Sequence, residues 1–316
     1  MSILKLKPIF QERIWGGRKL ETDFFYQIPD GLIGECWGIS AHQHGDSIIE
    51  EGEFTGKHLS ELWRDHRDRL FGNYEMDAFP LLVKILDAND DLSVQVHPND
   101  QQAFDLEGES YGKTECWYVL DAEPNAEIIL GHKAQTKEEM KSLTSEGKWD
   151  ELLQRQPVKR GDFIFVKSGK VHAIGKGIVI LETQQSSDTT YRVYDYDRVD
   201  SIGKKRELHL EKALQVTTVP DSPDPINTVK EIVISGEKTL LIEVPDFTVI
   251  HHKISGSNYQ VVIRDSFQLL SIIEGSGRIL TDSDMFEVKK GDHFIITREV
   301  KELVASGKME LITSYV

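Results

Sequence analysis

Cysteine and long apolar runs are both scarce in this 316-residue chain. Its two cysteines, Cys36 and Cys116, cannot build a disulfide framework, which is typical of a reducing compartment. No apolar run approaches the ~20 residues that a membrane span needs. Lys5 and Lys7 interrupt the apolar N-terminus, where a signal peptide would have its core. The sequence therefore predicts a cytoplasmic protein with no membrane partner.

Positive charge is also in deficit. The chain has 37 Lys and Arg against 53 Asp and Glu, a formal net charge of -16. A field of this sign argues against nucleic acid or an anionic membrane surface as the main partner. An anionic small substrate would need local Lys or Arg to overcome that field. No obligate protein partner is evident.

Strand-like segments are abundant. The 39% hydrophobic and 28% charged residues are typical of a globular protein, and the length suits about two domains. Helical spacing occurs in 57–71 and in 136–153, where Thr136 and Glu139 have the spacing of a capping box. Many short strands with few helices predict a mainly β fold, a sandwich or barrel with inserted helices. The segments expected as strands are 79–86, 92–96, 116–120, 126–131, 162–166, 177–183, 248–254, 267–273, 285–290, 293–297 and 309–316.

The segment VPDSPDPINT (219–228) divides the chain. Its three prolines are incompatible with a central strand or with the interior of a helix. We interpret it as a linker. The predicted domains are residues 1–220, which carry the helical insertions, and the smaller residues 221–316.

An internal repeat supports this division. The stretch PVKRGDFIFVKSG (157–169) resembles EVKKGDHFIITRE (287–299), and the two Gly-Asp pairs lie 130 positions apart. In each copy we expect the glycine to take a positive φ in a tight turn and the aspartate to accept hydrogen bonds from turn amides. A strand that ends in a turn precedes each copy. This order resembles the cupin jelly roll, and two copies predict a double jelly roll, a bicupin.

Four residues in the first half form a candidate metal site. Gln95 and His97 project to the same face of one strand, because side chains alternate along a strand. Glu115 begins the next clear strand, and His172 follows the first repeat turn. Adjacent barrel strands would bring all four to the mouth of the barrel. Two imidazoles, a carboxylate and an amide oxygen suit Zn²⁺, with Mn²⁺, Fe²⁺ or Co²⁺ as alternatives.

The second repeat offers a contrast. A single strand histidine is more often a satisfied polar residue than a ligand, so the convergence of four residues carries the prediction. The stretch that begins at Phe267 has no histidine or glutamate at the matching place, and His251 and His252 lack a second set of ligands. We therefore expect one metal ion per chain. It would lie in a catalytic cupin domain, residues 1–220, and the barrel of residues 221–316 would hold none.

Two further histidines have metal-like spacing. His42 and His44 stand at i and i+2 in SAHQHGD and could bind a metal. No carboxylate-bearing strand partner is evident for them in the sequence. We therefore interpret this stretch as a loop.

Long blocks of the chain resemble a known family. The stretches 79–100 (FPLLVKILDANDDLSVQVHPND), 112–120 (GKTECWYVL), 166–175 (VKSGKVHAIG) and 181–198 (LETQQSSDTTYRVYDYDR) are similar to the signature blocks of type I mannose-6-phosphate isomerases. The whole length resembles the short bacterial form of that family. Thr114 departs from the Gly-Lys-Pro-Glu of the family block, and threonine fits an extended position beside Glu115.

The resemblance implies an activity and a set of roles. The family interconverts mannose 6-phosphate and fructose 6-phosphate. It implies a zinc site of Gln95, His97, Glu115 and His172, an active-site arginine at Arg192, and a substrate role for Lys113. An isomerisation of this kind passes through an enediol(ate), with an electrophile for the developing oxyanion and a group that takes and returns a proton.

The proton-transfer group has several candidates. Glu182 lies on a strand that should flank the mouth, and a carboxylate with a raised pKa is a competent base. A buried structural glutamate and a metal-bound water are the alternatives. Arg192 stays protonated, so we expect it to stabilise the enediolate or to position sugar oxygens. Its alternative role is a strand arginine paired with Asp195 or Asp197.

Lys113 and Ser110 are candidates for binding the phosphate. Both lie in the glycine-containing stretch GESYGKTE, which would present backbone amides together with a cation. A solvated turn residue is the alternative for Lys113.

Two other functions share the expected fold. A metal-dependent cupin enzyme such as a dioxygenase would have much of the same ligand set, and oxygen consumption would identify it. A non-catalytic sugar-binding cupin would bind mannose 6-phosphate without turnover. The matched blocks around His97 and Arg192 favour the isomerase.

Overall fold

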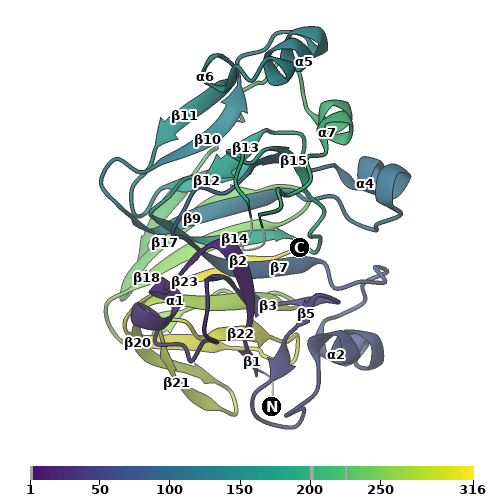
Figure 1. Cartoon of the computed structure of the whole chain (residues 1–316). Coiled ribbons are helices and arrows are strands. Elements are labelled where there is room, and N and C mark those ends of the chain that lie inside the picture. Colours follow the sequence, from purple (N-terminus) through teal and green to yellow (C-terminus); the bar gives the residue numbers. More distant parts are fainter. Residues whose placement is uncertain (1–2, 200–202, 225) are drawn as a thin grey trace.

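The computed structural model describes residues 3–199, 203–224 and 226–316, and β-sheets dominate it (Figure 1). The predicted mainly β fold is confirmed, and each of the segments expected as a strand overlaps an observed one. A five-stranded sheet has the order β11 (Leu153–Pro157), β10 (Glu127–His132), β13 (His172–Ile174), β8 (Val94–Val96) and β15 (Tyr191–Tyr194). A six-stranded sheet has the order β12 (Phe163–Val166), β9 (Glu115–Ala122), β14 (Ile178–Gln185), β7 (Leu81–Ala88), β3 (Ile33–Ile39) and β2 (Ile9–Gly17).

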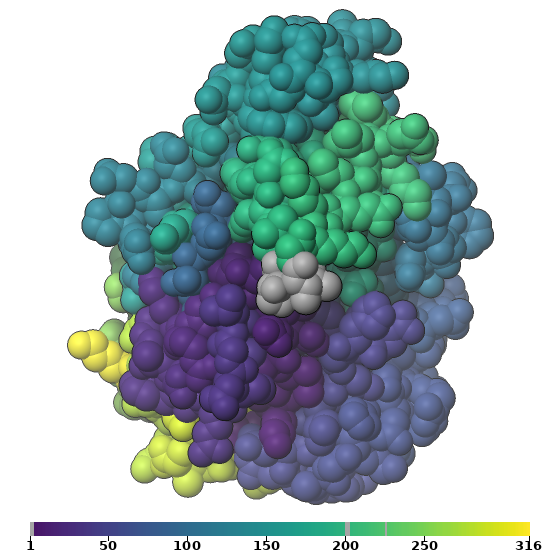
Figure 2. Space-filling model, in the orientation of Figure 1, coloured from purple at the N-terminus to yellow at the C-terminus, as the bar shows by residue number. Residues whose placement is uncertain are grey.

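A third, ten-stranded sheet forms the C-terminal part. Its order is β16 (Val229–Val233), β17 (Gly236–Glu243), β18 (Thr248–Ile254), β23 (Leu303–Tyr315), β20 (Gln268–Thr281), β22 (His293–Ile296), β1 (Ile3–Lys7) and β6 (Ile48–Ile49). Two more strands, β19 (Tyr259–Gln260) and β21 (Met285–Lys289), pair with β23 and β20. Strands β1 and β6 come from the start of the chain, and Figure 2 shows its purple N-terminal residues spread between green and yellow segments. The domain boundary at residue 220 stays a prediction.

The sheets stack in layers with separate apolar cores. One core fills part of the space between the five-stranded and six-stranded sheets, with Trp117, Ile128 and Ile180 among its members. The other face of the six-stranded sheet packs on the ten-stranded sheet through side chains such as Ile85 and Leu269. The first two sheets therefore enclose an interior of their own, and the rest of that interior holds polar residues.

Helices cover the outside of these layers. The expected helix over 57–71 is present as α2 (Leu59–Asp65) and α3 (Arg67–Leu70). The one over 136–153 is present as α5 (Lys137–Ser145) and α6 (Trp149–Leu152), which lie with α7 (Leu210–Val216) over the five-stranded sheet (Figure 1). Thr136 caps α5 by accepting from the amide of Glu139 at 3.1 Å. The side chain of Glu139 reaches the amide of Gln135, one residue before the one that a capping box requires.

The repeated turn has the same construction in both halves. Gly161 and Gly291 have φ values of 88° and 92°, a region open to glycine at little cost. The aspartate that follows each glycine accepts from the amide three residues earlier, at 2.9 Å for Asp162 and 2.8 Å for Asp292. The roles predicted for the glycine and the aspartate are confirmed.

The segment expected as a linker lacks regular structure. The described residues of 219–228 form neither helix nor strand, and Pro225 lies outside the described residues. Two of its carboxylates anchor it, since Asp221 and Asp224 each lie 3.0 Å from the ammonium of Lys170. Elsewhere, α1 (Lys19–Thr22) follows β2, α4 (Asp100–Glu107) follows β8, and β4 (Ala41–His42) pairs with β5 (Gly45–Asp46). None of the helices in the described part of the chain has the length and apolarity needed to cross a membrane.

Candidate metal centre and active site

Strand register places three candidate residues in one row of the five-stranded sheet. His172 on β13 lies directly opposite Gln95 on β8, and Gln95 lies opposite Arg192 on β15. Directly opposite residues in neighbouring strands point to the same face, so the three side chains share one side of the sheet. His97 is two residues beyond Gln95 and joins them.

A second row crosses the six-stranded sheet. Trp117 on β9 lies opposite Glu182 on β14, Glu182 opposite Lys84 on β7, and Lys84 opposite Trp37 on β3. Glu115, two residues before Trp117, shares its face. The two rows meet across the interior between the sheets. Residues spread over about 150 positions of sequence are thereby brought to one place.

His97, Glu115 and His172 form a compact group of possible metal ligands. Their ligand atoms all lie within 4.8 Å of one another, and all three side chains are buried. The Nε2 atoms of His97 and His172 lie 3.6 Å and 3.4 Å from the Glu115 carboxylate oxygens. The side-chain amide of Gln95 lies 3.5 Å from Nε2 of His97 and 3.3 Å from Nε2 of His172. Amide N and O are interchangeable by a flip of the group, so Gln95 can present its oxygen to the same centre.

Both imidazoles are held in the tautomer that a metal ligand needs. Nδ1 of His97 donates to the carbonyl of Thr189 at 2.8 Å, and Nδ1 of His172 donates to the carbonyl of Lys170 at 2.8 Å. These bonds leave the Nε2 lone pairs free to face the centre. Burial, reinforced by the charge of Lys113, lowers the pKa of His97 well below its usual value. Burial also lowers the pKa of His172 to about 3, so both rings are neutral near pH 7.

Lys113 brings positive charge into this group. Its ammonium donates to the carboxylate of Glu115 and lies 3.2 Å from Nε2 of His97. Burial alone would lower the pKa of Lys113, but the charges of Glu115 and Glu182 outweigh burial and raise it. The alternative of a solvated turn residue does not hold, because Lys113 is 4% exposed.

Glu182 has the properties expected of a proton-transfer group. It is 3% exposed, and burial together with the charge of Glu115 raises its pKa. The Trp117 indole donates to both Glu115 and Glu182 at 3.1 Å each, which links a candidate ligand to the candidate base. The ammonium groups of Lys84 and Lys113 lie 3.6 Å and 3.9 Å from Glu182 Oε1. A buried carboxylate with a raised pKa has the property expected of a general base.

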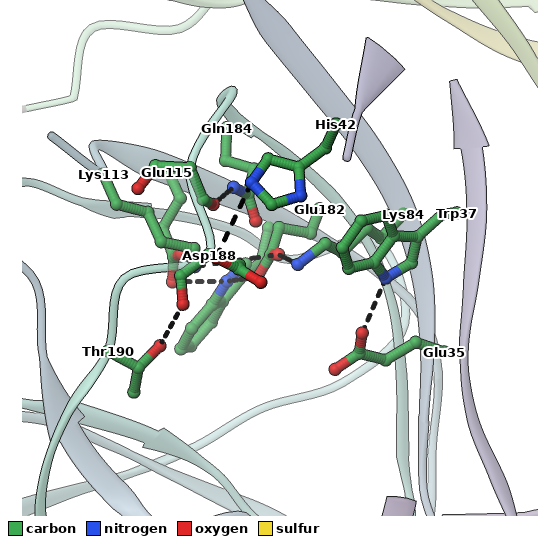
Figure 3. A network of polar contacts seen from close by, with 12 residues as sticks. Glu35, Trp37, His42, Lys84, Lys113, Glu115, Glu182, Gln184, Asp188 and Thr190 are labelled. Carbon is green, nitrogen blue, oxygen red and sulfur yellow. Dashed lines mark hydrogen bonds and ion pairs between the residues drawn. The ribbon is translucent and has the colours of Figure 1, made fainter. Parts of the chain in front are cut away.

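The two rows border a cavity of about 340 Å³. Figure 3 shows its polar network from close by, with Lys84 beside Trp37 and a hydrogen bond from the Trp37 indole to Glu35. The residues that line the cavity are Arg13, Trp15, Glu35, Trp37, Lys84, Leu86, Leu92, Ser93, Gln95, Lys113, Glu182, Asp188, Thr190, Arg192 and Arg206. A cavity of this size and polarity suits a small, hydroxyl-rich, anionic ligand.

Positive charge gathers on one part of this cavity wall. Arg192 donates to the hydroxyl of Ser93 at 3.3 Å and to the carbonyl of Glu207 at 2.8 Å. The alternative pairing of Arg192 with Asp195 is not what forms, because Asp195 binds both Arg198 and Arg206. Asp197 pairs with Lys205. Burial and the nearby charge of Arg206 lower the pKa of Arg192, as expected where arginines outnumber carboxylates.

Ser110 stands apart from the other predicted site residues. It is exposed, in the stretch between α4 and β9, and it is not among the residues that line the cavity. The structure thus brings together Gln95, His97, Lys113, Glu115, His172, Glu182 and Arg192, and leaves Ser110 outside. A phosphate-binding role for Ser110 gains no support from this position.

Sequence reasoning missed several residues of the cavity. Lys84 and Glu35 are charged residues inside largely apolar strands, and that anomaly was a usable signal. Arg13 holds Glu35 with two hydrogen bonds of 3.0 Å each. Burial opposes ionisation of Glu35, but Lys84 and Arg13 outweigh it and lower its pKa. Arg206 gave no local signal, since it lies in a polar stretch between β15 and α7.

Comparison with known proteins identifies the family of the chain. The family model "Phosphomannose isomerase type I, catalytic domain" matches residues 3–132, and "Mannose-6-phosphate isomerase, cupin domain" matches residues 236–316. Mannose-6-phosphate isomerase ManA of Bacillus subtilis is 51% identical over 312 residues, which cover 99% of this chain and 98% of the relative. Mannose-6-phosphate isomerase of Streptococcus mutans is 48% identical over 314 residues, with 99% and 98% covered. The crystal structure of mannose 6-phosphate isomerase from Bacillus subtilis matches over 100% of both chains, with a TM-score of 0.97 and 44% identity.

Proposed function

This chain belongs to the family of type I phosphomannose isomerases, and we propose that it interconverts mannose 6-phosphate and fructose 6-phosphate with one zinc ion. The observation that carries the proposal is the buried group of His97, Glu115 and His172, which adjoins a cationic cavity. The resemblance seen in the sequence is confirmed at the level of the family.

The donor set fits a divalent ion. Two neutral imidazoles, a carboxylate and an amide oxygen are the nitrogen and oxygen ligands that Zn²⁺ accepts. The Lys113 ammonium already lies among these donors, so the group favours a cation at its centre. Gln95, His97, Glu115 and His172 would hold the ion, which would act as a Lewis acid on the sugar oxygens.

Glu182 is our candidate for the residue that moves the proton between C1 and C2. It lies beside the ligand Glu115 through their shared Trp117 contact, and it lines the cavity. Its raised pKa lets it accept a proton from carbon and return it without being held as a stable anion. Lys84 and Lys113 lie close enough to offset its charge before the proton arrives.

Arginine side chains would bind the anionic parts of the substrate. Arg192 lies opposite Gln95 in the sheet, next to the candidate ligands, so we assign it to the enediolate oxygens. Arg13 and Arg206 line the same cavity and are the better candidates for the phosphate than Ser110. These side chains supply the local positive charge that an anionic substrate would need to approach a chain with a net charge of -16. Both cysteines are buried free thiols, which is consistent with our proposed cytoplasmic location.

One coupled assay tests the proposal. Purified protein should convert mannose 6-phosphate to fructose 6-phosphate, lose the activity on chelation, and regain it when zinc is added back. Binding of mannose 6-phosphate without turnover would contradict an enzyme and favour a sugar-binding cupin. Oxygen consumption with restored iron, in place of isomerisation, would favour a dioxygenase.

A further inference from the structure

A second group of metal-ligating side chains lies at the edge of the cavity. Within residues 3–199, 203–224 and 226–316, two groups bring three such donors within 4.8 Å, and the second consists of His42, His44 and Asp188. His42 ends β4, and His44 lies in the turn before β5. Asp188 comes from the loop between β14 and β15 and also lines the cavity. The carboxylate partner that the sequence did not reveal is thus supplied from 144 positions beyond His44.

The three donors already converge. Nδ1 of His44 lies 2.6 Å from Oδ2 of Asp188, and Nε2 of His42 lies 3.6 Å from Oδ1 of the same carboxylate. The two imidazole rings are 4.9 Å apart between centroids. Ligands of a tetrahedral zinc ion with bonds near 2.0–2.1 Å lie ~3.3 Å from one another. Small side-chain rotations would bring all three donors to that spacing.

The surroundings favour a ligand over a simple surface pair. The rings of His42 and Trp37 pack in a T-shaped arrangement with centroids 5.7 Å apart, and the His42 side chain is 11% exposed. Nε2 of His42 faces Asp188, as Figure 3 shows. The amide of His44 donates to Nδ1 of His42 at 3.3 Å, so the ring proton lies on Nε2, and a metal ion bound at Nε2 would move that proton to Nδ1 at the cost of this long hydrogen bond. Burial opposes ionisation of Asp188, but His44 and His42 outweigh it and lower the pKa of the carboxylate. Asp188 is therefore an anionic ligand at neutral pH.

We propose that His42, His44 and Asp188 form a second site for a divalent transition metal, at the rim of the cavity. The ion would take the place of the protons now shared between the imidazoles and Asp188, and water would complete its coordination. It would tie the β4–β5 hairpin to the loop that carries Thr189, whose carbonyl orients His97. Exposure of His44 makes this a weaker site than the buried one. The proposal does not depend on the isomerase activity.

Metal binding measured directly tests the site. Metal-free protein is titrated with Co²⁺ at constant pH, and bound metal is counted by equilibrium dialysis while the visible absorption of the ion reports the nitrogen and oxygen ligands. We expect two ions per chain, the second at least tenfold weaker. His44→Asn should weaken the second step at least tenfold and leave the first unchanged. His251→Asn, which breaks the His251–Glu310 pair on the far barrel, should keep both steps.

Several outcomes would overturn the proposal. One is a single ion bound by the unaltered protein. Another is an unchanged second step in both His44→Asn and Asp188→Asn. Circular dichroism melts of the variants guard against loss of folding, and His44 is exposed enough that His44→Asn should fold. Failure of the isomerase proposal would give a different result. The unaltered protein would then not convert mannose 6-phosphate, but it would still bind the second Co²⁺ ion.

Discussion

The two jelly-roll halves share a turn and a strand register but differ in what fills their interiors. In the first, Glu115 pairs with Val166, the fourth residue after Asp162. In the second, Gln268 pairs with Ile296, the fourth residue after Asp292. Glu115 is a carboxylate among imidazoles, whereas Gln268 is an amide that donates to the carbonyl of Val262. The same backbone positions therefore carry a candidate ligand in one half and a structural amide in the other.

The other side chains inside the two barrels differ in the same way, since the second interior is largely apolar and the first also holds charged groups. The second barrel is packed with apolar side chains such as Leu270, Phe294 and Leu303. Burial of such groups stabilises the fold at ~25 cal/mol per Å². The first barrel instead buries Lys84, Lys113, Glu115 and Glu182, whose desolvation opposes folding unless each charge has a partner. An interior of this kind makes sense for binding and chemistry, which the second barrel would not need to perform.

The largest effect should come from removing one histidine in each half. We expect His172→Ala to lose the metal and to lower kcat/KM by ~1000-fold or more, since it would remove one ligand of the proposed zinc ion. His252 is the matched residue, because it is equally buried but bonded to Tyr259 and Thr313 at 3.0 Å and 2.9 Å. His252→Ala should keep metal and turnover but lose about 2–4 kcal/mol of unfolding free energy. Metal analysis, steady-state kinetics and urea unfolding measure the three quantities. If His172→Ala retained the metal, the proposed difference between a metal-binding first barrel and a structural second barrel would be wrong.

Glu182→Gln should lower kcat by ~100- to 10,000-fold, because the amide cannot take a proton from carbon. The metal should stay bound. Burial raises the pKa of Glu182, and a proposed base acts as its anion, so kcat of the unaltered enzyme should fall as pH drops below that pKa. The variant should lack this acidic limb. Glu310→Gln, on the second barrel, should leave both kcat and the pH profile alone, and the same loss in both variants would refute the assignment.

Arg192→Ala tests the positive charge at the first barrel. We expect kcat to fall ~100- to 1000-fold with zinc still bound, as for loss of one oxyanion donor. Arg278→Ala is the control, since Arg278 forms an exposed pair with Glu287 on β21. Arg206→Ala should act mainly on KM if it binds the phosphate. An unchanged kcat for Arg192→Ala would leave this arginine with a structural role alone.

Site residues that belong to a local sequence pattern could be predicted from the sequence. Residues whose place depends on the pairing of strands far apart in the chain could not. The alternation around Gln95 and His97 and the repeated Gly-Asp turn could be read locally, and both are present as predicted. The placement of Lys84 beside Glu182, and of Asp188 beside His42, depends on which strands and loops become neighbours. The same holds for β1, which pairs with β22 although no local sequence pattern predicts this pairing. Long-range pairing is set by the packing of whole sheets, which a single strand does not encode.

The smallest expected effect is a difference in unfolding free energy between alanine variants of the two repeated turns. Gly161 and Gly291 share a positive φ, so alanine at either position costs about 1–2 kcal/mol in backbone strain. Their surroundings differ. A Cβ at residue 161 would have the Tyr118 hydroxyl at 3.9 Å as its nearest neighbour, whereas at residue 291 it would lie 2.8–3.1 Å from atoms of Tyr26. Tyr26 also donates to the Gly291 carbonyl at 2.5 Å, so its ring cannot move away freely.

Gly291→Ala should therefore destabilise the protein more than Gly161→Ala, by about 1–3 kcal/mol of overpacking beyond the shared strain. Urea unfolding of both variants measures the difference. The control is the loss of unfolding free energy that Gly291→Ala causes in a Tyr26→Ala background. Without the Tyr26 ring, this loss should equal the one that Gly161→Ala causes. Equal losses in the two single variants would mean that the turns differ in sequence context but not in packing. The contrast between the halves would then lie in their interiors alone.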